Sequence, residues 1–204
     1  MIIDNKLLQC GICRVAVVDD GIDWLDWASK LSKPTLDSLT FEGDSHYAFY
    51  RNIMDEPSFP FPIILNHVAA AVQKYFDVNS MEEMRLDDAF CVHYNTSQKD
   101  SSGAKHTDPS DITINMCLEV SDNIEGSQVK FYGTKNLHDV LPLKDDDSAS
   151  AFLVEQQPGY ATIHWGDHPH ETLPIEHGRR TNVIMTLMFK DKSRSQAANR
   201  TCYY

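Results

Sequence analysis

The sequence has few basic residues for its length. Lys and Arg total 18 among 204 residues against 30 Asp and Glu, which gives a formal net charge of −12 and a pI near 5.0. A field of this sign repels the phosphates of nucleic acids, so we expect no nucleic-acid partner. The chain also lacks a run of the roughly 18 apolar residues that a membrane helix needs, and no cationic leader precedes an apolar core at its start. We therefore expect no membrane association and a cytoplasmic location.

Cysteines are also scarce. Their number is five, which is odd, and they are scattered along the chain at Cys10, Cys13, Cys91, Cys117 and Cys202. This pattern argues against a disulfide framework. Cys10 and Cys13 form a single C-x-x-C pair, and without a second pair they are better interpreted as ordinary small residues than as zinc ligands. The sequence contains no G-x-S-x-G motif, which disfavours a serine hydrolase.

The hydrophobic content of 42% is enough for one globular domain spanning residues 1–204. We divide this domain into an N-terminal strand with supporting helices (1–87), a β-rich core (88–190) and a polar, frayed tail (191–204). No internal repeat is apparent, and the sequence does not predict an oligomeric state.

Two N-terminal segments repeat apolar side chains at helical intervals. Residues 20–31 and 63–76 are therefore predicted to be amphipathic helices, and Pro62 suits the first turn of the second helix. A strand is predicted at residues 13–19. Residues 33–62 are irregular and rich in Pro, Ser and Asp, which predicts a loop with short turns.

After residue 87 the apolar period changes from about 3.6 residues to about 2, as in β-strands. Strands are predicted at five segments bounded by Gly, Pro, Asn or Asp, namely residues 89–94, 112–118, 128–132, 160–165 and 182–189. Short strands at this spacing are typical of a β-sandwich or barrel. The acidic stretch 133–150 is predicted to be an exposed excursion.

A His-X-Asp pair at His106 and Asp108 is the first sign of chemistry. In an extended segment these two side chains point to the same face, so they offer an imidazole and a carboxylate to one point. A third ligand from a neighbouring strand would complete two His and one carboxylate on one face of a metal. That set leaves coordination positions open and is diagnostic of non-haem Fe(II) oxygenases.

Three histidines compete for the third position: His164, His168 and His170. A strand that carries the last ligand and then returns through a Gly turn at Gly178 must bring a cation back to the same cavity. Arg180 follows His170 by ten residues, and this spacing favours His170 over the other two.

Five segments resemble the Fe(II)/2-oxoglutarate-dependent dioxygenases, and within them the prolyl 4-hydroxylase and lysyl hydroxylase branch. They are FCVHYN at residues 90–95, KHTD at 105–108, DITINMCL at 111–118, EGSQVKFY at 125–132 and HETLPIEHGRR at 170–180. The resemblance covers residues 88–190, about half the chain. It implies an α+β, mainly β fold: a double-stranded β-helix, or jelly roll, with supporting N-terminal helices.

The resemblance also implies the roles of individual residues. His106, Asp108 and His170 hold Fe(II), and Arg180 binds the distal carboxylate of 2-oxoglutarate through its planar fork of donors. Arg179 is adjacent, and strand alternation allows only one of the two guanidinium groups to point inward.

Three further residues are candidate cosubstrate contacts: Tyr94, Asn115 and Thr186. The first two lie on strands expected to line the cavity, and Thr186 shares strand parity with Arg180. One departure from the family pattern is Ser127, which follows Gly126 where the family often has Gly-Gly. The implied cofactors are Fe(II), 2-oxoglutarate and O2, with ascorbate as a further candidate.

The reaction implied by the resemblance is hydroxylation of an aliphatic C–H bond with release of succinate and CO2. Asp108 favours hydroxylation over halogenation, because related halogenases leave that coordination position to halide. The branch suggests a Pro or Lys side chain of a peptide or protein as substrate, with a free amino acid or other small metabolite as the alternative. An alternative of another class is a catalytically silent metal- or ligand-binding jelly roll.

Overall fold

The structure is a computed structural model that describes residues 4–19, 21–32, 49–54, 56–98, 101–135, 137–138 and 151–197. Its helices are α1 (Asn5–Gln9), α2 (Trp24–Leu31), α3 (Phe61–Tyr75) and the short 3-10 helix η2 (Met81–Glu83). Its strands are β1 (Ile12–Ala16), β2 (Phe49–Asn52), β3 (Met84–Asn95), β4 (Gly103–His106), β5 (Ile112–Val120), β6 (Glu125–Gly126), β7 (Val129–Tyr132), β8 (Ala151–Val154), β9 (Tyr160–Trp165), β10 (His170–Thr172), β11 (Ile175–His177) and β12 (Arg179–Phe189).

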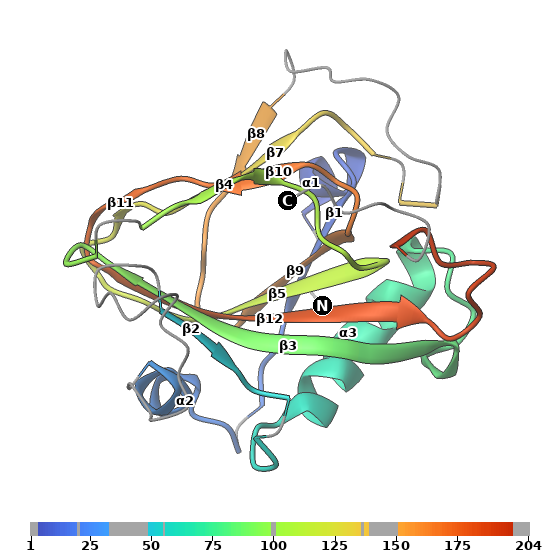
Figure 1. The fold of residues 1–204 in the computed structure, drawn as a ribbon, viewed down its shortest axis with the longest axis horizontal. Coiled ribbons are helices and arrows are strands. Elements are labelled where there is room, and N and C mark those ends of the chain that lie inside the picture. The colour runs from blue at the N-terminus through green and yellow to red at the C-terminus, as the bar shows by residue number, and fades with distance from the viewer. Residues whose placement is uncertain are drawn as a thin grey trace.

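Two antiparallel sheets face each other. The larger sheet has six strands in the order β1-β9-β5-β12-β3-β2, and the smaller has four in the order β4-β10-β7-β8. A two-stranded ribbon, β11-β6, extends beside them. Figure 1 shows α2 and α3 on the outer side of the larger sheet, away from the smaller one. This is the jelly roll with N-terminal supporting helices that the sequence predicts.

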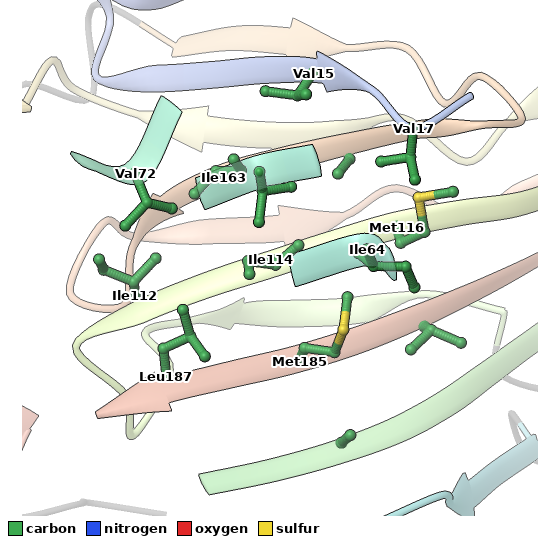
Figure 2. Packing of buried hydrophobic residues seen from close by; sticks show 14 of the residues in the cluster. Val15, Val17, Ile64, Val72, Ile112, Ile114, Met116, Ile163, Met185 and Leu187 are labelled. Carbon is green, nitrogen blue, oxygen red and sulfur yellow. The ribbon is translucent and has the colours of Figure 1, made fainter. Parts of the chain in front are cut away.

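The main core lies between α3 and the outer face of the larger sheet. Ile64, Val68 and Val72 recur on one stripe of α3 and are fully buried. Alternate residues of the strands meet them, among them Ile114 and Met185 (Figure 2). Since side chains alternate across a strand, the residues between these core positions face the smaller sheet. The inner face is where the polar side chains of the larger sheet gather.

Both predicted helices are confirmed, and their ends have local causes. The Asp23 carboxylate accepts hydrogen bonds from the backbone N–H groups of Leu25 and Asp26, so it caps α2. Pro62 lies in the first turn of α3, where its missing N–H costs no helical hydrogen bond. Among the described residues, no helix is both long and apolar enough to cross a membrane.

The five strands predicted in the core are all present as β3, β5, β7, β9 and β12. The prediction of a loop over residues 33–62 was wrong for residues 49–52, because Phe49–Asn52 forms β2 and pairs with β3 at the edge of the larger sheet. The β2 sequence FYRN does not alternate apolar and polar residues, so this strand had no sequence signal.

The prediction that residues 133–150 form an exposed excursion was also wrong for its first residues. Lys135 and Leu137 are buried, and the Leu137 carbonyl accepts a hydrogen bond of 3.0 Å from the Trp165 indole. The Lys135 ammonium pairs with Asp167. Residues 139–150, which include the acidic run, lie outside the described part of the chain.

The start of the tail packs onto the domain, which corrects the prediction that residues 191–204 are frayed. The buried Asp111 carboxylate accepts hydrogen bonds from the backbone N–H groups of Phe189, Gln196 and Ala197 and from the Ser195 hydroxyl, at 2.8 to 3.2 Å. The Asp111 side chain thus fixes the backbone of the chain as far as residue 197. Residues 198–204 lie outside the described residues.

Candidate functional site

The smaller sheet brings two of the predicted ligands together. His106 on β4 and His170 on β10 are direct register partners, and their ring centroids are 4.5 Å apart. Asp108 follows β4, where its backbone N–H donates to the carbonyl of Gly166 at 2.7 Å. The ligand atoms of His106, Asp108 and His170 all lie within 4.8 Å of one another.

Backbone carbonyls fix the tautomers of both imidazoles. Nδ1 of His106 lies 2.6 Å from the Ala104 carbonyl, and Nδ1 of His170 lies 2.9 Å from the His168 carbonyl. A carbonyl only accepts, so each Nδ1 carries the proton and donates it. Each Nε2 then faces Asp108 Oδ1, at 3.4 Å for His106 and 3.8 Å for His170. Hydrogen bonds from the ring nitrogen that faces away from the metal fix the ring orientation of metal-ligating histidines in this way.

Asp108 is held in its ionised form. Burial acts to raise its pKa, but the neighbouring His170, the hydrogen bonds from His106 and Thr113, and His164 outweigh burial and hold the pKa well below its usual range. The Thr113 hydroxyl donates to Oδ2 at 2.5 Å. Oδ2 is therefore occupied by the protein, while Oδ1 is directed toward the two imidazoles. Two imidazoles and one carboxylate form a donor set that fits a divalent first-row metal such as Fe(II).

The structure separates the three competing histidines. His170 belongs to the cluster of potential ligands, whereas His168 points Nε2 at the Gly133 carbonyl, 3.2 Å away, and does not line the cavity. His164 lines the cavity with Nε2 3.9 Å from Asp108 Oδ2, and its Nδ1 donates to the Trp165 carbonyl. Burial lowers the pKa of His164 to about 3, so this third imidazole beside Asp108 is neutral.

A cavity of about 120 Å³ extends from this cluster between the two sheets. Four residues line it from the smaller sheet, namely Gly103, His106, His170 and Thr172, and the larger sheet contributes most of its remaining wall. The full lining is Tyr50, Phe90, Val92, Tyr94, Gly103, His106, Asp108, Thr113, Asn115, His164, His170, Thr172, Arg180, Asn182 and Ile184.

Arg180 is the cation of this cavity. It is only 2% exposed, and burial lowers its pKa, although the nearby Tyr94 acts in the opposite direction. Its Nη1 donates to the Ser127 carbonyl at 2.7 Å, and its guanidinium lies 4.9 Å from the centre of the Tyr94 ring. In the described part of the chain Arg180 has no ion pair, and its Nε has no hydrogen-bond partner. A buried guanidinium in this state fits an anionic ligand.

Arg179 points the other way. Its Nη2 lies 2.7 Å from the Glu119 carboxylate, and its side chain is 57% exposed. The alternation of β12 therefore places Arg180 inward and Arg179 at the surface.

The three further candidates have different surroundings. Tyr94 and Asn115 line the cavity, and Asn115 Oδ1 accepts a hydrogen bond of 2.5 Å from Asn182 Nδ2. The structure does not bring Thr186 to the cavity. Its hydroxyl accepts from the backbone N–H of Asp88 at 3.0 Å and lies 3.3 Å from the Asp88 carbonyl, beside a bulge in the pairing of β3 and β12.

Ser127 retains the turn expected of a second glycine. Its φ is +70°, next to Gly126 with φ +78°, and both values fall in the left-handed region. A Cβ at Gly126 would lie 2.1 Å from the Pro174 carbonyl, so only that position requires glycine. Ser127 tolerates the conformation and directs its carbonyl at Arg180.

Sequence reasoning missed Thr113, Asn182 and Tyr50 as site residues. Thr113 shares strand parity with Asn115 on β5, and Asn182 shares it with Arg180 on β12, so alternation alone places both on the inner face. Tyr50 belongs to β2, the unpredicted edge strand, and had no such signal.

No family model matches the chain, and no curated protein matches it significantly in sequence. Solved structures match it in fold. The non-haem α-ketoglutarate-dependent epimerase SnoN from nogalamycin biosynthesis is 18% identical with a TM-score of 0.65, over 90% of this chain and 80% of SnoN. An oxidoreductase of the 2OG-Fe(II) oxygenase family from Burkholderia pseudomallei is 12% identical with a TM-score of 0.63, over 97% and 91% of the two chains.

A third match is the viral collagen prolyl hydroxylase vCPH from Paramecium bursaria Chlorella virus-1. It is 11% identical with a TM-score of 0.56, over 87% of this chain and 94% of vCPH. At these identities the comparisons show the fold, a mainly β jelly roll, and they leave function to the site. SnoN has also been solved in complex with Fe3+ and α-ketoglutarate.

Proposed function

We propose that the protein is an Fe(II)- and 2-oxoglutarate-dependent dioxygenase that hydroxylates an aliphatic C–H bond. One observation carries the proposal: the His106, Asp108 and His170 cluster shares a cavity with Arg180, a buried guanidinium that forms no ion pair with any described residue. A metal site alone would suit many proteins. A metal site with a separate carboxylate receptor suits a cosubstrate that reaches both, as 2-oxoglutarate does.

The two ends of the cavity would bind different groups. His106, Asp108 and His170 would hold Fe(II), and Arg180 would bind the distal carboxylate of 2-oxoglutarate through charge-assisted hydrogen bonds. Bound Fe(II) would activate O2, which is the oxidant: one oxygen atom would enter succinate as 2-oxoglutarate loses CO2, and the other would be inserted into the substrate C–H bond. Thr113 keeps Oδ2 of Asp108 engaged, so one carboxylate oxygen is presented to the metal.

The ends also differ in their access to solvent. Arg180 and Tyr94 are 2% and 3% exposed, whereas the His106 side chain is 49% exposed. The cosubstrate carboxylate therefore lies at the closed end, where water is excluded and the guanidinium field is strong. The substrate approaches at the open, metal end.

We infer that this substrate is a Pro or Lys side chain of a peptide or protein. The sequence segments of the prolyl and lysyl hydroxylase type support this, as does the fold shared with vCPH. A side chain that projects from a peptide suits an opening at His106, because the rest of the peptide remains outside. A small metabolite is the second candidate, favoured by the fold shared with SnoN, an enzyme of nogalamycin biosynthesis.

The test is succinate formation from 2-oxoglutarate with Fe(II), O2 and ascorbate, using peptide libraries containing Pro or Lys and free amino acids in parallel. We expect a gain of one oxygen on a peptide, detected by mass spectrometry, and no turnover in Asp108→Ala. Hydroxylation of free amino acids alone would move the function to small-molecule metabolism. Binding of metal and 2-oxoglutarate without turnover on any substrate would instead support a catalytically silent module.

A further inference from the structure

Tyr50 brings a second phenol to the closed end of the cavity. It belongs to the edge strand β2, where it pairs with Val92 of β3, and it is the residue of β2 that lines the cavity. Its hydroxyl oxygen lies 2.9 Å from the hydroxyl oxygen of Tyr94. The two residues are 44 positions apart, so only the pairing of β2 with β3 brings them together.

The tertiary packing around this pair is specific. The Tyr50 ring meets the Tyr94 ring edge to face, with centroids 6.4 Å apart at 81°, and packs against Phe90 at 6.1 Å. Tyr94 is the direct register partner of Arg180, whose guanidinium lies over its ring. Tyr50, Tyr94 and Arg180 therefore form a continuous row from the sheet edge to the buried cation.

A phenolic hydroxyl rotates about its C–O bond, so by itself it does not present its proton in one direction. Either hydroxyl of the Tyr50–Tyr94 pair could be the donor. When Tyr50 donates, Tyr94 accepts on one side and directs its own proton to another. A carboxylate beside Arg180 is a strong acceptor for such a donor, since the hydrogen bond is charge-assisted.

We propose that Tyr50 is a positioning residue that orients the Tyr94 hydroxyl to donate to the cosubstrate carboxylate bound by Arg180. The inference rests on the proposed function, because it takes 2-oxoglutarate as the anion. It assigns a role to β2: the edge strand contributes to cosubstrate affinity without itself touching the metal cluster. It also predicts that the contributions of the Tyr50 and Tyr94 hydroxyls to 2-oxoglutarate affinity depend on each other.

A double-mutant cycle tests this interdependence. The variants are Tyr50→Phe, Tyr94→Phe and the double variant, and the measurement is the Kd of 2-oxoglutarate by anaerobic calorimetry on the Fe(II)-loaded protein. Phe keeps both rings and removes only the hydroxyls. We expect each single variant to weaken binding by about 3- to 10-fold. In a protein that already carries Tyr94→Phe, adding Tyr50→Phe should change the Kd little, because the Tyr94 hydroxyl that Tyr50 orients is then absent.

Tyr132→Phe is the matched control. Tyr132 donates to Glu171 at 2.5 Å and does not line the cavity, so its loss should leave the Kd unchanged. In turnover assays, Tyr50→Phe should have a raised KM for 2-oxoglutarate and an unchanged kcat. Its Tm should also be unchanged.

Two results would overturn the role of Tyr50. One is an unchanged Kd in Tyr50→Phe, and the other is full additivity in the double variant, which would mean that Tyr50 acts independently of Tyr94. A fall in Tm with no change in Kd would likewise reduce Tyr50 to a packing residue. Failure of the wild-type protein to bind 2-oxoglutarate at all is a different outcome, because it would refute the proposed function itself.

Discussion

Replacement of Arg180 by Ala tests the cosubstrate pocket most directly. Arg180 is only 2% exposed, so the contact of its guanidinium with a carboxylate is only weakly screened. Truncating one partner of a buried, hydrogen-bonded charge pair costs about 2 to 5 kcal/mol. At about 1.4 kcal/mol for each factor of ten, 2-oxoglutarate should bind roughly 30- to several-thousand-fold more weakly to Arg180→Ala.

The same substitution should affect folding and metal binding much less. Without cosubstrate, Arg180 is a desolvated cation that no described carboxylate neutralises, so its removal relieves a cost as well as opening a cavity. We expect iron binding to be nearly unchanged. Saturating 2-oxoglutarate should raise the Tm of the wild-type protein, because a ligand that binds the folded state stabilises it, and this rise should vanish in the variant.

Two companion variants sharpen the assay, which measures the KM and Kd for 2-oxoglutarate and the ligand-dependent Tm. Arg180→Lys should recover only part of the affinity, because an ammonium keeps the charge but not the planar fork. Arg179→Ala removes an exposed guanidinium that pairs with Glu119, and it should behave like the wild-type protein. A large defect in Arg179→Ala, with near-normal binding in Arg180→Ala, would refute this account of the pocket.

Three further predictions concern the metal cluster and the scaffold. Asp108→Ala and His170→Ala should lose Fe(II), measured by metal analysis after desalting, whereas His168→Ala should retain it; loss in His168→Ala alone would disprove the ligand set. Asp111→Ala leaves three backbone N–H groups without their acceptor and should lower the free energy of unfolding in urea by about 3 kcal/mol or more. Ser127→Gly relieves a left-handed Ser and should stabilise the fold by up to about 1 kcal/mol, seen as a higher Tm.

The fold was predictable where strands show alternation. β5 and β12 carry apolar residues at every second position toward α3, and their period is visible in the sequence. β2 (FYRN), β6 (EG) and β8 (AFLV) do not alternate apolar and polar residues, whereas β7, also only four residues long, places Lys130 between Val129 and Phe131. The existence of β2, β6 and β8 depends on pairing with distant strands, and local sequence does not encode that pairing.

The meeting of His106, Asp108 and His170, which we propose as the metal site, was predictable for a related reason. His106 and Asp108 are two residues apart in an extended segment, so their common orientation follows from local geometry. His170 needed the spacing to Arg180 and the family resemblance, because three histidines occur within seven residues. Thr186 shows that strand alternation alone does not identify a cavity residue. It has the same alternation as Arg180, but it lies beside a bulge and its hydroxyl is hydrogen-bonded to the backbone of Asp88.

The register at the start of β12 determines which guanidinium enters the cavity. A slip of one residue would exchange Arg179 and Arg180 and leave Glu119 facing the wrong partner. Gly178 secures the register from one side, since its φ is +88° and a Cβ there would lie 2.2 Å from the Ser121 hydroxyl. The same hydroxyl accepts from the Arg179 N–H at 3.0 Å. The position of the buried cation, and with it the chemistry proposed for the cavity, is therefore set by a turn outside the cavity as much as by the residues that line it.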